Sequence, residues 1–195
     1  NAMKLTRRRF VTIASAACLT ASHANAFRWQ GTALGARAQI VLDHPRAVTI
    51  AEAAQAEIDR LENVFSLYRP ESELSRLNAS GRLLAPSYAM QECLAVAKIV
   101  HSVTDGRFDP SVQPLWRLQA MSSRQGLAIP LADLEEARDR IGFDRVRINE
   151  ARISLGEGQE LTLNGIAQGY IADRIAALGE QSTQHAHDIA VHDRR

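Results

Sequence analysis

The chain has 195 residues, of which 46% are hydrophobic and 5% aromatic, a composition typical of a globular domain and not of a disordered or fibrous protein. The formal net charge is +1, but residues 1–26 hold four basic and no acidic side chains, so residues 27–195 carry a net charge of −3. Because no basic stripe with interleaved aromatic residues remains, we expect no binding to nucleic acid.

Residues 1–26 have the pattern of an export signal. Three arginines at residues 7–9 precede an apolar run over residues 10–19, and residues 24–26 have the small-x-small form of a signal-peptidase site. The paired arginines are typical of a twin-arginine signal, so we predict a periplasmic protein. Residues 1–2, which precede the first methionine, are interpreted as the remnant of a cleaved tag.

The two cysteines lie on opposite sides of the predicted cleavage site. Cys18 lies inside it and Cys93 is the single cysteine after it, so no intrachain disulfide can form once the signal is removed. Lipid attachment at Cys18 is the alternative, and it would associate the protein with the inner membrane. We favour cleavage after Ala26, because Ser15 stands where lipoprotein sites usually have a leucine.

The segments after the signal predict both strands and helices. Residues 27–42 alternate as a strand or hairpin does. Three segments have apolar residues at helical spacing: 50–65, 90 to a stop at Asp105-Gly106, and 131–140. Residues 146–163 read as two or three short strands separated by turns. This mixture with antiparallel pairs predicts the α+β class.

The segment Leu161–Leu178 combines an extended stretch with a helix. Leu161 and Leu163 alternate, a turn containing Gly165 follows, and apolar residues recur at helical spacing from Ile166. Such a junction presents unpaired N–H groups and the positive end of a helix dipole, which suits a phosphate or a phosphate-bound metal. The pattern is also common where no ligand binds, so a purely structural role stays open.

Residues 180–195 lack a helical stripe and almost all large apolar side chains. We predict a disordered tail there. Three of the six histidines fall in it, and we favour a solvated tail over a metal site because they have no structured partner.

Three blocks occur in this order: FSLYRPESELSRLN at 65–78, DGRFDPSVQPLW at 105–116 and LTLNGIAQGYIADRIAAL at 161–178. Together they resemble the ApbE family of FAD-dependent protein flavinyltransferases, over about residues 27–178. The matching residues are Ser66, Tyr68, Arg69, Ser72, Leu74, Ser75, Leu77, Asn78, Gly106, Phe108, Asp109, Pro114, Leu115, Gly165, Gly169 and Tyr170.

The resemblance implies a T-fold-like mixed sheet with packed helices, incomplete at the C-terminus. The family continues beyond Leu178 with a strand carrying paired glycines and with an Asp and a Thr that ligate magnesium. Two interpretations account for this difference: the protein is naturally shortened, or the sequence is a fragment of a longer one. Residues 27–179 would then be the N-terminal part of the flavinyltransferase domain.

In the first block, the resemblance implies that Tyr68 packs on the flavin ring system. Ser72 and Asn78 would order the same polar loop or contact the ligand. From the residues alone, a half-buried core tyrosine and ordinary capping or turn residues are the alternatives.

In the second block, the resemblance implies that Arg107, Phe108 and Asp109 meet the adenosine half of FAD. Asp109 precedes a proline, so we expect it to be extended. A cap at a turn is its alternative role.

In the third block, Thr162 and Gln168 replace charged residues of the common family pattern. The resemblance implies that the Gly165 carbonyl ligates Mg²⁺, which prefers hard oxygen ligands. Asn164 and Gln168 would hydrogen-bond the isoalloxazine edge or the pyrophosphate.

The resemblance implies cleavage of FAD at its pyrophosphate and transfer of FMN to a threonine hydroxyl of an acceptor protein, such as a membrane redox subunit. No catalytic residue is identified. Because charged site residues and the later metal ligands are missing, we predict little or no transferase activity for this chain, and self-association through exposed sheet edges. A flavin-binding protein without transferase activity and an inactive remnant are the alternatives.

Overall fold

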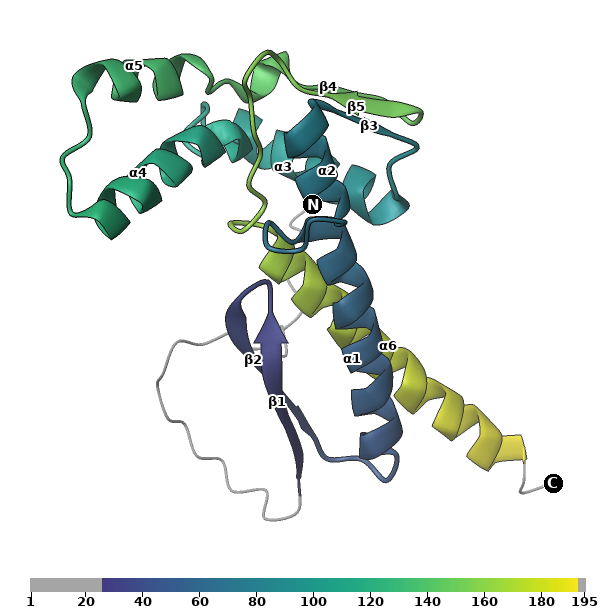
Figure 1. The fold of residues 1–195 in the computed structure, drawn as a ribbon. Helices are drawn as coiled ribbons and strands as arrows, with labels where there is room; N and C mark the ends of the chain where they lie inside the picture. The colour runs from purple at the N-terminus through teal and green to yellow at the C-terminus, as the bar shows by residue number, and fades with distance from the viewer. Residues whose placement is uncertain (1–25, 193–195) are drawn as a thin grey trace. The chain divides into compact units, whose positions relative to one another are not determined.

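The computed structural model describes residues 26–192, and the predicted export signal lies outside them except for Ala26. The described chain forms two compact units, one made of the residues up to Ile58 and from Ile171, the other of Asp59–Tyr170 (Figure 1). The helices are α1 (Ala47–Phe65), α2 (Glu73–Ser80), α3 (Tyr88–Val103), α4 (Gln113–Gln125), α5 (Leu131–Asp139) and α6 (Ala167–His192). The strands are β1 (Phe27–Ala33), β2 (Ala36–Leu42), β3 (Arg82–Leu84), β4 (Arg147–Ile148) and β5 (Arg152–Ser154), and two short 3₁₀ turns are η1 (Pro110–Val112) and η2 (Phe143–Arg145).

The first unit contains the hairpin β1–β2, which confirms the prediction over residues 27–42. The strands pair antiparallel through their whole length, and Leu34 and Gly35 join them with φ angles of 51° and 77°. Positive φ at both central residues is what a tight hairpin turn requires. In the same unit, Arg174 of α6 lies 3.9 Å from Glu57 of α1. None of the described helices is long and apolar enough to span a bilayer.

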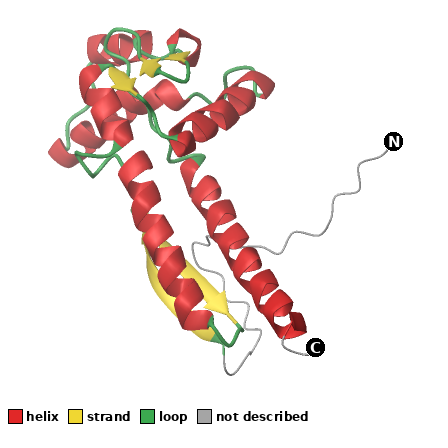
Figure 2. Ribbon diagram, turned by 90° about the vertical axis from the view of Figure 1, so that its right-hand side faces the viewer, coloured by secondary structure: helices red, strands yellow, loops and turns green. Residues whose placement is uncertain are grey.

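The second unit holds a three-stranded antiparallel sheet in the order β3-β5-β4. Ile153 of the central strand is fully buried and pairs with Leu83 on one side and Ile148 on the other. Figure 2, coloured by secondary structure, shows these strands as far shorter than those of the hairpin. The core of this unit is apolar and mostly helical, with fully buried Leu61, Phe65, Leu74, Leu77, Met90, Leu94, Leu161 and Leu163.

The predicted helices are found as α1, α3 and α5, and the two sheets confirm the α+β class. A polar loop was expected after α1, but residues 73–80 form helix α2. Ser72 caps its N-terminus, and Gly81 ends it with φ of 70°. Two buried leucines in eight residues are too few to give a periodic signal.

Two further expectations differ from the structure. Residues 161–163, expected to form a strand, belong to no strand in the described part of the chain. The tail expected to be disordered from Glu180 continues as helix to His192. Because no glycine or proline occurs between Glu180 and His192, the local sequence contains nothing that must end a helix.

Candidate functional site

Asn78, in α2, makes two hydrogen bonds to the segment before α6. Its side-chain oxygen accepts a hydrogen bond from the Leu161 N–H, and its side-chain nitrogen donates one to the Leu161 carbonyl, both at 2.8 Å. Leu161 is fully buried, so its peptide groups need partners within the protein. The amide of Asn78 therefore supplies a partner to both polar groups of the Leu161 backbone.

The second block contacts the same segment at two points. The Thr162 N–H donates to the Pro110 carbonyl at 2.8 Å. The Phe108 ring lies over Gly165, where an added Cβ would stand 3.2 Å from the ring carbon Cε2. Because that distance is tighter than ordinary van der Waals contact, a glycine lets the ring and the backbone approach closely. Residues from all three blocks are thus brought together.

A short turn leads from this segment into α6. The Leu163 carbonyl accepts hydrogen bonds from the N–H groups of Ile166 at 2.9 Å and Ala167 at 2.7 Å. Asn164 and Gly165 are exposed at the turn, and Gln168 is half-buried in the first turn of the helix. The first N–H groups of a helix have no partner in the helix itself and carry its positive dipole end. Because the N–H groups of Ile166 and Ala167 are already bonded to Leu163, an anion at this turn would interact mainly with the positive dipole end of α6.

The Tyr68 loop is organised by Ser66. The Ser66 hydroxyl accepts hydrogen bonds from the N–H groups of Tyr68 at 3.0 Å and Arg69 at 3.2 Å. Its carbonyl accepts from the hydroxyls of Ser72 at 2.5 Å and Ser75 at 3.0 Å. Tyr68 itself is 78% exposed, which excludes the alternative of a half-buried core tyrosine. Ser72 is fully buried and caps α2, so its hydroxyl is occupied within the protein.

Asp109 is extended, as expected before a proline, with φ of −131° and ψ of 110°. One carboxylate oxygen accepts from the N–H of Ser111 at 2.7 Å and from its hydroxyl at 2.6 Å, and the other from the Phe143 N–H at 3.2 Å. Its side chain is only 12% exposed. The structure thus uses Asp109 as the cap of η1, while Arg107 beside it is exposed.

His101 is a site residue that sequence reasoning missed. It lies in the last turn of α3, and its Nδ1 is 2.8 Å from the Phe108 carbonyl oxygen. The only signal in the sequence was a histidine five residues before the glycine of the second block. That spacing alone does not distinguish a solvated histidine at a helix end from one that contacts the block.

The motif residue Tyr170 packs into the core beneath the turn. Its hydroxyl donates to a carboxylate oxygen of Glu92 at 2.6 Å, and its ring meets Phe65 edge-on at 5.5 Å between centroids.

Cys93 lies in α3 beside Glu92. Burial raises the pKa of the Cys93 thiol to about 12, and the charge of Glu92 adds to that shift. Cys93 is therefore held neutral and is not a nucleophile for this site.

The chemistry available to a metal ion at the turn is that of neutral oxygens. Within residues 26–180, no three His, Cys, Asp or Glu side chains are grouped so that they could hold a metal ion. Gly165 is an exposed residue, and its carbonyl and the Thr162 hydroxyl, which accepts from the Asn164 N–H at 3.4 Å, offer the hard oxygen ligands that Mg²⁺ prefers. These residues fit a cation that takes its remaining ligands from a bound phosphate.

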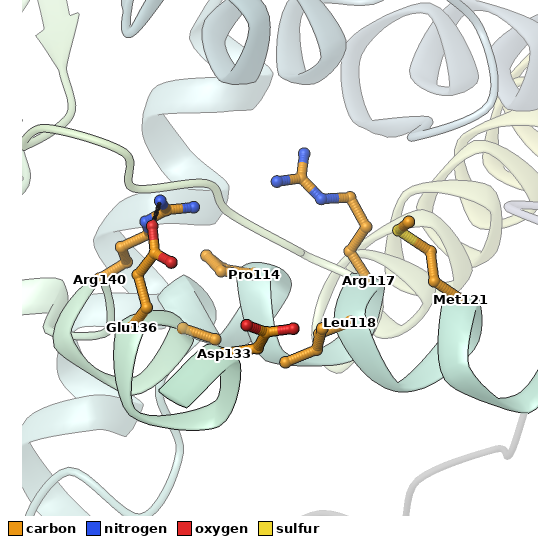
Figure 3. A pocket seen from close by; sticks show the side chains of 8 residues that line it. Pro114, Arg117, Leu118, Met121, Asp133, Glu136 and Arg140 are labelled. Atoms are coloured by element: carbon orange, nitrogen blue, oxygen red, sulfur yellow. Dashed lines mark hydrogen bonds and ion pairs between the residues drawn. The ribbon is translucent and has the colours of Figure 1, made fainter. Parts of the chain in front are cut away.

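A hollow of about 170 Å³ lies between α4 and α5 (Figure 3). Its two guanidinium groups are already paired, Arg117 with Glu160 and Arg140 with Glu136. Pro114 is its only residue from the matched motif positions. We therefore place the candidate site at the turn before α6 and not in this hollow.

The fold is shared with solved structures of ApbE proteins. It superposes on a variant of the flavin transferase ApbE from Vibrio cholerae with a TM-score of 0.73 at 22% identity, over 80% of this chain and 57% of that one. The ApbE protein of Thermotoga maritima gives a TM-score of 0.71 at 26% identity, over 79% and 52% of the two chains. The ApbE family model matches residues 33–191, and the chain belongs to this family.

The curated relatives are named FAD:protein FMN transferases. That of Salmonella typhimurium is 31% identical over 150 residues, which are 72% of this chain and 43% of the relative. That of Escherichia coli K12 is 27% identical, over 72% of this chain and 42% of the relative. The chain thus spans less than half the length of these relatives.

Proposed function

We propose that the chain binds FAD at the turn before α6 and serves in the transfer of FMN from FAD to an acceptor protein. The observation that carries the proposal is the meeting of the three blocks: Asn78, Pro110 and Phe108 all contact residues 161–165. A helix N-terminus and an exposed glycine at that point suit the pyrophosphate. The names of the relatives supply the substrate class.

The parts of FAD are assigned by the chemistry of each region. The exposed ring of Tyr68 would stack on the isoalloxazine. Arg107 and Phe108 would meet the adenosine half. Asn164 and Gln168 would donate to the isoalloxazine edge or the pyrophosphate.

Ser72, Asn78 and Asp109 would act differently from the other predicted ligands. Ser72 and Asp109 cap helical turns, and Asn78 uses both atoms of its amide on Leu161. We therefore propose that these three hold the site in shape and do not touch FAD.

In the transfer step, the threonine oxygen of the acceptor forms a new bond to the phosphorus of the FMN half. The pyrophosphate bridge breaks, AMP leaves with the electron pair, and the hydroxyl proton is released. The protein's part is to orient the pyrophosphate at the α6 N-terminus. Mg²⁺, when bound through the Gly165 carbonyl and the phosphates, would supply neutralisation of the developing charge.

Flavin binding without transfer is the second candidate function. Two observations favour it: Thr162 and Gln168 are neutral, and the described residues offer no acidic cluster for a metal. A metal held mainly by its substrate is poorly fixed, and misplacement of reacting groups by about 1 Å can cost on the order of 100-fold in rate.

We propose periplasmic location on the basis of the signal pattern in residues 1–26, and an acceptor in a membrane redox subunit. We also propose self-association. Exposed Val96, Ile99 and Val103 fall on one face of α3, and β3 and β4 have open edges in the described sheet. Light scattering over a range of concentrations tests this, and a monomer throughout would contradict it.

The experiment that separates the functions has two stages. The chain is titrated with FAD and followed by flavin fluorescence, then incubated with FAD, Mg²⁺ and an acceptor peptide that carries a threonine, with a Thr-to-Ala peptide as control. Binding with fluorescence retained on the threonine peptide alone supports transfer. Binding without labelling supports the second candidate, and absence of binding overturns both.

A further inference from the structure

The backbone of Phe108 is held at both of its polar groups by the end of α3. The Phe108 N–H donates to the Thr104 hydroxyl at 3.1 Å, and the Phe108 carbonyl oxygen lies 2.8 Å from His101 Nδ1. Thr104 is itself tied to α3, since its hydroxyl donates to the Val100 carbonyl at 2.8 Å. The peptide groups of Phe108 are therefore fixed relative to α3, while its side chain lies over Gly165.

The hydrogen bond determines where His101 carries its proton. A carbonyl oxygen only accepts, so Nδ1 must be the protonated nitrogen. In the neutral ring, Nε2 is then an acceptor, 3.7 Å from a carboxylate oxygen of Asp144. The Asp109 carboxylate is 3.9 Å from Nδ1. Because Nδ1 is protonated in both the neutral and the cationic ring, the bond to Phe108 persists in either state.

The environment of the ring supports a fixed orientation. The side chain is 12% exposed, and it meets Phe143 edge-on with 5.6 Å between ring centroids and 67° between planes. A half-turn of the ring about its axis would bring a carbon in place of Nδ1 and leave the Phe108 carbonyl without this donor. A half-buried carbonyl without a donor is unfavourable.

We propose that His101 is a positioning residue of the flavin site: its Nδ1–H fixes the Phe108 carbonyl, and through it the ring that covers Gly165. The role rests on the proposed function, because the contact it sets is the one assigned to FAD. His101 itself does not touch the ligand. Its loss would let the Phe108 segment move away from the turn that receives the pyrophosphate.

Two substitutions separate the hydrogen bond from ring packing. His101→Asn places an amide nitrogen near the position of Nδ1, whereas His101→Gln reaches the position of Nε2; both remove the ring from Phe143. We expect His101→Asn to retain FAD affinity within about twofold and His101→Gln to weaken it by about five- to tenfold. Thr104 offers a matched pair of variants. Thr104→Ser keeps the hydroxyl and should retain FAD affinity, whereas Thr104→Val removes the hydroxyl and should weaken FAD affinity.

A measurement without ligand keeps the inference separate from the function. Amide hydrogen exchange in residues 105–109 should be faster than wild type in His101→Gln and near wild type in His101→Asn. Equal exchange and equal FAD affinity in the two variants would overturn the positioning role. If the wild-type chain does not bind FAD, the proposed function fails, and the exchange difference still decides whether His101 holds Phe108.

Discussion

The Tyr68 loop and the segment Leu161–Ile166 are ordered in different ways. In the loop, Ser66 accepts four hydrogen bonds, from partners no more than nine residues away. In the segment, Asn78 lies 83 residues from its partner Leu161, and the Pro110 carbonyl comes from another distant block. Hydrogen bonds between residues close in sequence shape the loop that exposes Tyr68. Hydrogen bonds between residues far apart in sequence hold the turn before α6.

Because of this difference, we expect substitutions in the two regions to affect different quantities, FAD affinity in one and the free energy of unfolding in the other. Tyr68 contributes a ring to the surface and little to the core, so its loss should cost affinity alone. The segment at 161–166 contains the buried Leu161 and Leu163 and is held by part-buried hydrogen bonds, so we expect its supports to affect the free energy of unfolding as well.

Cys93 is buried in the core, so its rate of reaction with a thiol reagent measures how well the core excludes the reagent. Its pKa is raised from 9.0 to about 12 by burial, with Glu92 adding to the shift, so its thiolate fraction near pH 8 is about a thousandfold below that of a free thiol. In a Cys18→Ser background, we therefore expect labelling by a thiol reagent to be much slower than that of a free thiol. Asn78→Ala should accelerate labelling and Tyr68→Ala should not. Equal acceleration by both would contradict the separation of the two regions.

The same shift has a consequence for stability at high pH. The folded state raises the pKa of Cys93, so the unfolded chain releases the proton first as the pH increases. The contribution of Cys93 is therefore constant below pH 9.0 and is lost progressively toward about pH 12. Urea unfolding at stepped pH, compared between wild type and Cys93→Ala, measures it. A contribution that grows across this range would show that the sign is wrong.

Asn78→Ala removes both bonds to Leu161 and leaves its peptide groups without their partners. We expect a loss of about 2–3 kcal/mol in the free energy of unfolding, and a melting temperature lower by about 5–10 °C. Asn164→Ala, at an exposed asparagine in the same segment, is the control and should change stability little. Equal free energies of unfolding for Asn78→Ala and Asn164→Ala would contradict a stabilising role for the Asn78–Leu161 hydrogen bonds.

Gly165→Val tests the contact with Phe108. Even a single added Cβ would lie 3.2 Å from the ring, and the larger side chain would displace the ring or the turn. We expect FAD affinity to fall by about tenfold. Gly169→Ala is the control, since a Cβ there has no neighbour within 4 Å. Alanine is a better helix former, so Gly169→Ala should keep affinity and stabilise α6 by up to about 1 kcal/mol.

Tyr68→Ala should give the smallest effect. Stacking of an aromatic ring contributes about 1 kcal/mol beyond area burial, so we expect FAD affinity to fall several-fold while the melting temperature stays unchanged. Tyr88 is a matched control, because it is 74% exposed on α3 while Tyr68 is 78% exposed. If Tyr88→Ala weakened FAD binding as much as Tyr68→Ala, Tyr68 would have no special place in the site.

The sequence determined the elements that depend on local pattern. Apolar spacing located α1, α3 and α5, alternation located the β1–β2 hairpin, and the proline after Asp109 predicted its extended backbone. The order of the three blocks indicated the family, which the family model confirms. These features depend on neighbours a few residues away, and periodicity records such neighbours.

Tertiary structure alone decided which predicted site residues are free to meet a ligand. Ser72, Asn78 and Asp109 have the same hydrogen-bonding groups as ligand-binding side chains, but in the fold those groups are used on α2, Leu161 and η1. His101 became a site residue only because α3 ends beside Phe108. A donor's partner depends on which backbone group the fold brings within about 3 Å, and residue identity alone does not fix that distance.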